Sequence, residues 1–185
     1  KARQATDSLR EHLVDTDALR VIAFADTPDT VFDSGDAAID WDTLHAAMSP
    51  LEPAGGTAAG VALDAATQLP PRKGKHRLVV LVSDLDTEPF DADAVAADLI
   101  RNDTSLAIVE VHASELMAGP TGTPEGVLAL SQLAEQMQSP RITYSATFTI
   151  DQLATIFAKF ITQTRGEPVR RGEFTAGSIT LPTAS

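Results

Sequence analysis

The sequence predicts an α/β domain with a doubly wound, mostly parallel sheet flanked by helices and one antiparallel edge strand. Three observations support this. Strand-like and helix-like segments alternate along the chain. Residues 77–82 contain an unbroken apolar run, which is typical of a parallel strand buried on both faces. Two short apolar runs, at 20–25 and 30–33, are separated by a turn through Pro28, which predicts an antiparallel hairpin.

The first half of the chain predicts helices around this hairpin. Residues 2–13 carry apolar side chains on one stripe and charged side chains outside it, as in an amphipathic helix. A short helix is expected at 40–48. A break rich in proline and glycine follows at 50–56, and Thr57 then opens a helix of small residues.

The second half continues the alternation after the strand at 77–82. Apolar residues at helical spacing and short apolar runs predict, in order, a helix at 91–101, a strand at 105–111, a helix at 124–137, a strand at 141–144 and a helix over 150–161. In the helix at 91–101 we expect Val95, Leu99 and Ile100 to face inward.

Length and composition favour one globular domain. The chain has 185 residues, the size of a single domain. We expect residues 1–164 to form it and residues 165–185, which contain several glycines and prolines, to be an extension or linker. Residues 174–181 are a weaker candidate for an edge strand.

Charge and composition exclude several kinds of partner. The 14 Lys and Arg against 26 Asp and Glu give a net charge of −12, so the surface repels nucleic acid and attracts cations. With no cysteine, disulfides and cysteine-bound zinc are excluded. No apolar run approaches the ~20 residues of a membrane span. No signal is visible either, and the compartment is left open between cytoplasm and cell exterior.

The motifs of common enzyme classes are also absent. The sequence has no phosphate-binding loop of the G-x-x-x-x-G-K-[ST] type and no G-x-S-x-G elbow. The segment 55–60 has glycines, but the preceding residues are no strand, so a dinucleotide fingerprint is excluded. We therefore expect a protein that is not an enzyme.

Two oxygen-bearing side chains remain as candidates for a site. Asp84 follows the most apolar strand, and Thr57 follows a glycine pair. Because ligands bind at the carboxyl ends of strands in such sheets, the two side chains can converge on a hard cation such as Mg²⁺. Two purely structural roles stay open: Thr57 as a helix N-cap and Asp84 as a cap of the following turn.

The order of four stretches resembles the von Willebrand factor type A (vWA) domain. Residues 20–26 resemble the second strand of that family, and residues 51–57 resemble the loop that carries its metal-binding threonine. Residues 78–84 resemble its fourth strand with the metal-site aspartate, and residues 153–160 resemble its closing helix. One difference is that Leu85 stands where the family has glycine. The resemblance implies a Rossmann-like α/β fold with a metal-ion-dependent adhesion site (MIDAS).

One part of the family pattern is missing. The family's first, central strand ends in Asp-x-Ser-x-Ser, which supplies an aspartate and two serines to the metal, and this sequence contains no such motif. Residues 1–14 resemble the helix that normally follows it. We therefore expect a sheet without its central strand, which is supplied by a separate peptide, missing from this sequence or replaced by residues 174–181.

The resemblance implies a function in binding. Thr57 and Asp84 would hold Mg²⁺ or Mn²⁺ together with the missing residues, and an Asp or Glu of a partner protein would complete the shell in adhesion or assembly. Asp26 and Asp86 would lie just outside the metal's ligands. Two alternatives stay open: a regulatory or substrate-presenting subunit of an AAA+ ATPase, and a metal-free structural vWA domain.

Overall fold

A computed structural model describes Thr6 and residues 9–52, 56–68, 75–111, 124–137, 141–147 and 150–165. The predicted helix at 2–13 falls largely outside this set. Thr6 and Leu9 are helical, but residues 10–12 already form a turn, so that helix ends earlier than predicted. Residues 69–74 and the extension from 166 onward, including the candidate strand at 174–181, lie outside the described residues.

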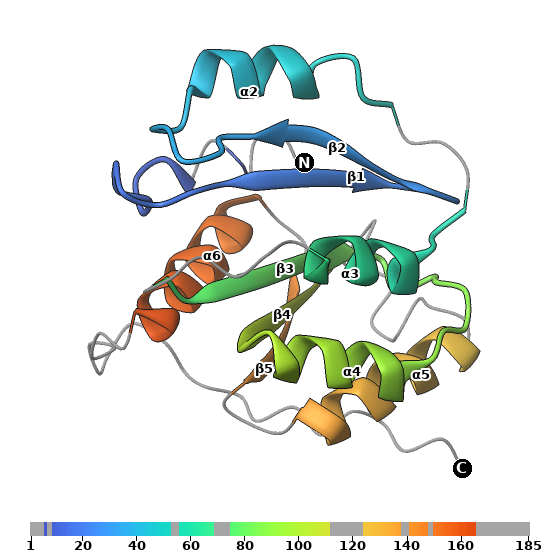
Figure 1. The fold of residues 1–185 in the computed structure, drawn as a ribbon. Coiled ribbons are helices and arrows are strands. Elements are labelled where there is room, and N and C mark those ends of the chain that lie inside the picture. The colour runs from blue at the N-terminus through green and yellow to red at the C-terminus, as the bar shows by residue number, and fades with distance from the viewer. Residues whose placement is uncertain are drawn as a thin grey trace.

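The described strands form two sheets (Figure 1). Strands β1 (Arg20–Phe24) and β2 (Pro28–Asp33) form the predicted antiparallel hairpin. Strands β3 (Arg77–Ser83), β4 (Thr104–Val111) and β5 (Ile142–Thr147) form a parallel sheet in the order β3-β4-β5. The α/β class and the mostly parallel pairing are therefore as predicted.

Five helices are described beyond the N-terminal segment (Figure 1). They are α2 (Trp41–Met48), α3 (Ala59–Thr67), α4 (Ala92–Arg101), α5 (Pro124–Met137) and α6 (Ile150–Thr164). None of the helices within the described ranges is both long and apolar enough to cross a membrane.

Helices cover both faces of the parallel sheet, although in the apolar run that predicted burial residues 77–80 are only half-buried and Leu81 is buried. On one face, α3, α4 and α5 pack on β3 and β4 through a cluster that includes Leu63, Leu99 and Leu133. On the other face, α6 packs through Phe157 and Phe160. One inward residue was predicted wrongly: Ile100 is 42% exposed, because it lies about 100° around the helix from Leu99, which faces the core.

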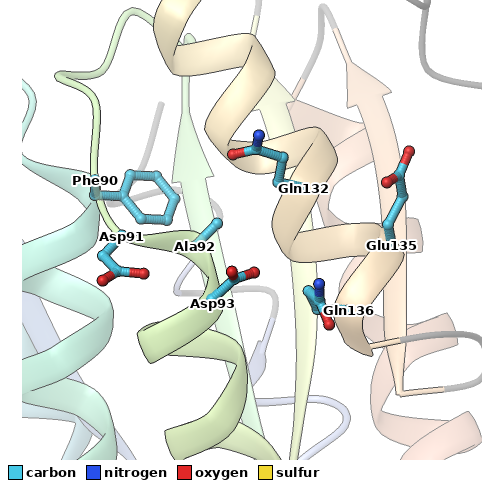
Figure 2. Close-up of a pocket in the computed structure, with 7 residues that line it drawn as sticks. All are labelled: Phe90, Asp91, Ala92, Asp93, Gln132, Glu135 and Gln136. Atoms are coloured by element: carbon cyan, nitrogen blue, oxygen red, sulfur yellow. The ribbon is translucent and has the colours of Figure 1, made fainter.

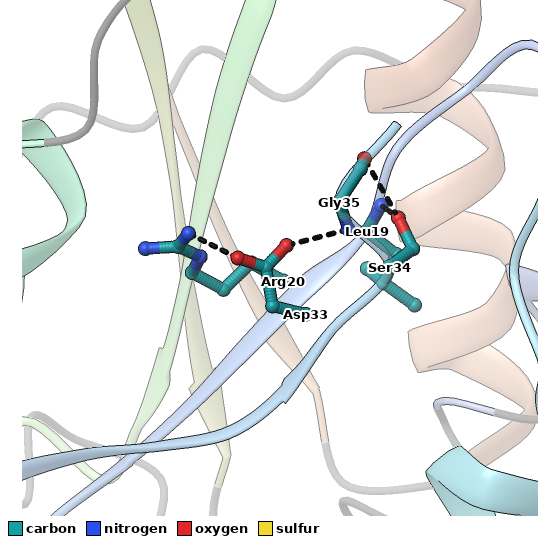
Figure 3. A network of polar contacts seen from close by, with 5 residues as sticks. All are labelled: Leu19, Arg20, Asp33, Ser34 and Gly35. Carbon is teal, nitrogen blue, oxygen red and sulfur yellow. Dashed lines mark hydrogen bonds and ion pairs between the residues drawn. The ribbon is translucent and has the colours of Figure 1, made fainter. Parts of the chain in front are cut away.

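The base of the hairpin is closed by polar contacts (Figure 3). The Arg20 guanidinium pairs with the Asp33 carboxylate, whose other oxygen accepts the Gly35 amide at 2.9 Å. The Leu19 amide donates to Ser34 Oγ at 3.1 Å. β2 begins at Pro28, where a turn was predicted; proline fits there because an edge strand does not need its N–H.

The turn after β3 holds a leucine in a strained conformation. Leu85 has φ of 64° and is 4% exposed, packed in the core beneath α3 and α4. Its amide donates to Ser83 Oγ at 3.0 Å, and its carbonyl accepts the Thr87 amide at 2.9 Å. The left-handed region costs a residue with a Cβ about 1–2 kcal/mol. Core packing and these hydrogen bonds together hold the strained backbone.

Helices α3 and α4 bring acidic groups together. Burial raises the pKa of the Asp64 carboxyl above its usual 3.8, and the negative charges of Asp98 and Asp91 raise it further. The ionised form of Asp64 is therefore less favourable in the folded chain than in the unfolded one.

We predict that Leu85→Gly is more stable than Leu85→Ala, by about 1 kcal/mol in urea unfolding. Both variants lose the same core packing, but only glycine relieves the positive φ. Leu99, a core residue within helix α4, is the control position. There we expect the opposite order, in which the alanine variant is more stable than the glycine variant by about 0.5–1 kcal/mol. If the alanine variant were more stable than the glycine variant at Leu85 as well as at Leu99, the claim that the turn at Leu85 is strained would be contradicted.

We also predict that Asp64→Asn raises the melting temperature at pH 7 by about 1–2 °C, since the group is largely solvated. Because the pKa of Asp64 is higher in the folded chain than its usual 3.8, protonation of Asp64 favours the folded state at low pH. This stabilisation is lost as the pH rises above 3.8. The increase in melting temperature of Asp64→Asn over the wild type therefore becomes smaller as the pH is lowered from 7 to 4. Asp29→Asn, on the exposed face of β2, is the matched control; an equal gain there, or a gain independent of pH, contradicts the prediction.

Candidate functional site

The carboxyl ends of β1 and β3 meet at one edge of the molecule. The chain leaves β1 at Ala25, whose carbonyl accepts the Ala58 amide at 2.8 Å. Ala58 immediately precedes α3, so the end of the hairpin is joined to the start of that helix. This edge is where ligands bind in wound parallel sheets.

A single backbone carbonyl joins the two predicted site loops. The Thr57 carbonyl accepts the Thr87 hydroxyl at 2.8 Å and the Glu88 amide at 3.0 Å. Thr87 is 2% exposed and lies three residues after Asp84. The structure thus brings the segment holding Thr57 against the segment that begins with Asp84, through contacts made by Thr87 and Glu88.

Thr57 itself is not the first residue of the helix. α3 begins at Ala59, and its N-cap residue, Ala58, offers no side-chain hydrogen bond. The Ala59 amide instead donates to Thr87 Oγ1 at 3.1 Å. The N-cap role considered for Thr57 is therefore taken by the Thr87 hydroxyl, 30 residues further along the chain, and Thr57 is not needed for it.

Asp26 and Glu88 lie beside the glycine that precedes Thr57. The Gly56 amide donates to Asp26 Oδ1 at 2.8 Å. A Cβ on Gly56 would lie 2.8 Å from the same oxygen and 3.8 Å from Glu88 Oε1, so a side chain there would press on the Asp26 carboxylate. The sequence reasoning placed Asp26 near the site but missed Glu88 and Thr87, which carry no local motif.

Asp84 and Asp86 are exposed in the turn after β3. Asp84 Oδ1 accepts the Asp86 amide at 3.2 Å, so Asp84 does make the turn-capping contact that was considered for it. Asp84 lies on the surface of this edge, in the turn whose later residues Thr87 and Glu88 contact the Thr57 carbonyl.

The edge offers oxygen donors suited to a hard divalent ion. A threonine hydroxyl and an exposed aspartate are ligands that Mg²⁺ accepts together with water, so the two residues fit part of such a site. Within the described ranges, no group of three or more His, Cys, Asp or Glu side chains is close enough to hold a metal ion by itself. A complete shell therefore needs hydroxyls, water or a partner's carboxylate.

A separate hollow lies between α4 and α5 (Figure 2). It has a volume of about 360 Å³ and is lined by Asp91, Asp93 and Glu135 with Gln132 and Gln136. Asp91 is occupied as the N-cap of α4, where it accepts the Ala94 amide at 3.0 Å. This hollow contains neither Thr57 nor Asp84, so it is distinct from the predicted site.

Comparison with known sequences found no match: no protein-family model and no curated protein is similar enough to be recognised. Comparison with solved structures found clear similarity. A von Willebrand factor type A protein from Catenulispora acidiphila superposes with a TM-score of 0.66 at 19% identity, over 91% of this chain. BatB from Bacteroides thetaiotaomicron gives 0.65 at 17% identity, over 90% of this chain and 87% of its own length.

Proximal thread matrix protein 1 from the mussel byssus, in a form with a zinc-occupied MIDAS motif, gives a TM-score of 0.61 at 16% identity over 88% of this chain. This chain spans only 38% of the Catenulispora protein and 39% of the mussel protein, so it corresponds to one part of each. Fold and element order agree with the family resemblance found in the sequence, and the chain has a von Willebrand factor type A-like fold.

Proposed function

We propose that this domain is a protein-binding module whose contact with its partner depends on a divalent metal ion. The observation that carries the proposal is the Thr57 carbonyl, which joins the Thr57 segment to the loop of Asp84 through Thr87 and Glu88. This junction supports the proposal, because it joins the two segments that carry the predicted metal ligands. The zinc-occupied MIDAS motif of the mussel thread protein supports the proposal, because that protein shares the fold.

Thr57 would contribute its hydroxyl and Asp84 its carboxylate to Mg²⁺ or Mn²⁺. The ion, when bound, supplies positive charge to which an Asp or Glu of a partner protein can coordinate. Asp26, Asp86 and Glu88 add negative charge to the same edge and favour capture of the cation. The binding makes and breaks no covalent bond, so the proposed role is assembly or adhesion and not catalysis.

We predict that the double variant Thr57→Ala, Asp84→Ala binds Mg²⁺ and Mn²⁺ at least about tenfold more weakly than the wild-type chain, because it loses two oxygen ligands. Isothermal calorimetry with each metal salt measures this directly. The titration is done in about 0.15 M NaCl, where the Debye length of about 8 Å suppresses loose binding to the acidic surface.

The matched control is Thr30→Ala, Asp29→Ala, which removes the same two residue types from exposed positions of β2. This control should bind metal like the wild type. Equal binding by the Thr57/Asp84 variant and the wild type would refute the site. A wild-type chain that binds neither metal would support the metal-free structural domain instead.

A further inference from the structure

The hollow between α4 and α5 is a polar cavity, and none of the described residues that line it is basic (Figure 2). Its volume of about 360 Å³ lies at the lower end of the ~300–1,000 Å³ that is typical of small-ligand pockets. Three carboxylates, two amides and one aromatic ring form most of its wall: Asp91, Asp93, Glu135, Gln132, Gln136 and Phe90. The cavity therefore has room for one side chain or one small ligand, and its charge favours a cation.

Most of these polar side chains have no protein partner within the ranges that the structure describes. Asp91 is the exception, because it caps α4 by accepting the Ala94 amide at 3.0 Å. In the described part of the chain, no hydrogen bond or ion pair engages the side chains of Asp93, Glu135, Gln132 and Gln136. Their donors and acceptors are left to water or to a ligand.

Glu135 stands at an electrostatically unfavourable position. It lies in the last turn of α5, where the helix dipole favours positive charge, and that turn contains no basic residue. It also shares the hollow with the carboxylates of Asp91 and Asp93, which repel it. A cation in the hollow would relieve the repulsion and would itself be favoured by the end of the helix.

Phe90 forms the apolar part of the wall. Helix α3 approaches it so closely that a Cβ on Gly60 would lie 2.4 Å from the Phe90 Cβ, and Phe90 packs against the apolar core cluster. These contacts hold the ring in place. Figure 2 shows the Phe90 ring and the Gln132 amide pointing toward each other. An aromatic ring near carboxylates favours an organic cation, which gains cation–π attraction in addition to ion pairing.

The spacing of the carboxylates favours such an organic cation over a metal ion. Among the residues described, no three His, Cys, Asp or Glu side chains are close enough to hold a metal together, so Asp91, Asp93 and Glu135 do not form the shell of one ion. A guanidinium is planar and larger, and its five N–H donors can reach carboxylates and amides at different points of a wall. It also stacks on aromatic rings.

We propose that this hollow binds the guanidinium of an arginine side chain that belongs to a partner polypeptide. Asp93 and Glu135 would accept its N–H groups. Phe90 would pack against its plane, and the amide oxygen of Gln132 would accept a further N–H. A polypeptide is favoured over free arginine as the source, because the carboxylates of the hollow repel the α-carboxylate of the free amino acid. The contact is separate from the proposed metal site.

The test titrates the full 185-residue chain with N-acetyl-arginine amide in EDTA and about 0.15 M NaCl, which removes metal binding and screens loose attraction to the acidic surface. N-acetyl-citrulline amide, which has nearly the same shape but no charge, is the ligand control. Calorimetry measures the affinity, and amide NMR shifts locate the site. We expect saturable binding of the arginine probe, at least about tenfold tighter than that of the citrulline probe, with the largest shifts at residues 91–93 and 132–136.

Substitutions test the wall of the hollow. Asp93→Asn, Glu135→Gln removes two charges with little change of shape and should weaken arginine binding at least about tenfold. Asp42→Asn, Glu125→Gln makes the same change of charge at exposed positions of α2 and α5 and should bind like the wild type. Phe90→Leu keeps an apolar side chain but loses the ring, and it should weaken binding about two- to fivefold.

Three outcomes would overturn the proposal. One is the absence of saturable binding, or equal affinity for the arginine and citrulline probes. Another is an equal loss of affinity in the Asp93/Glu135 variant and its control, since the general charge of the chain and not the hollow would then bind the probe. The third is tighter binding of free arginine than of the blocked probe, which would assign the hollow to an amino acid instead of a partner polypeptide. Because EDTA is present throughout, none of these results depends on the proposed metal site.

Discussion

The structure depends on the hydrogen bonds made by two consecutive backbone units, Thr57 and Ala58. The Ala58 amide holds the end of β1 through the Ala25 carbonyl, and the Thr57 carbonyl holds the loop after β3 through Thr87 and Glu88. The hairpin and the parallel sheet share no described ladder, so these bonds and the packing around α3 connect them at this edge, while the Lys75 ammonium donates to the Thr16 carbonyl at the opposite ends of the strands. Burial of the Thr87 hydroxyl makes the bonds costly to break.

The same edge concentrates charge and strain. Asp26, Asp84, Asp86 and Glu88 gather there in a chain of net charge −12, which gives the edge a negative potential. Leu85 holds its positive φ between Asp84 and Asp86. Strained backbone persists where the surroundings enforce it, and such positions occur often at functional sites. Charge and backbone strain therefore coincide in the turn after β3.

Local patterns predicted most of the fold. The residue range 124–137 of α5 was predicted correctly, and the hairpin was predicted from two short runs and a turn. The start of α3 was placed two residues early, because its N-terminal amide is capped by Thr87 from a distant loop, an interaction that no local sequence pattern contains. Glu88 was missed for the same reason, since it reaches the site only through tertiary contacts.

The most direct test of the central claim is paramagnetic broadening by Mn²⁺ in an amide NMR spectrum. If Thr57 and Asp84 share one ion, substoichiometric Mn²⁺ should first broaden the amides of residues 56–58 and 84–88, which come from both loops. First broadening around Asp91, Asp93 and Glu135, in the hollow between α4 and α5, or evenly over the acidic surface, would contradict a shared site.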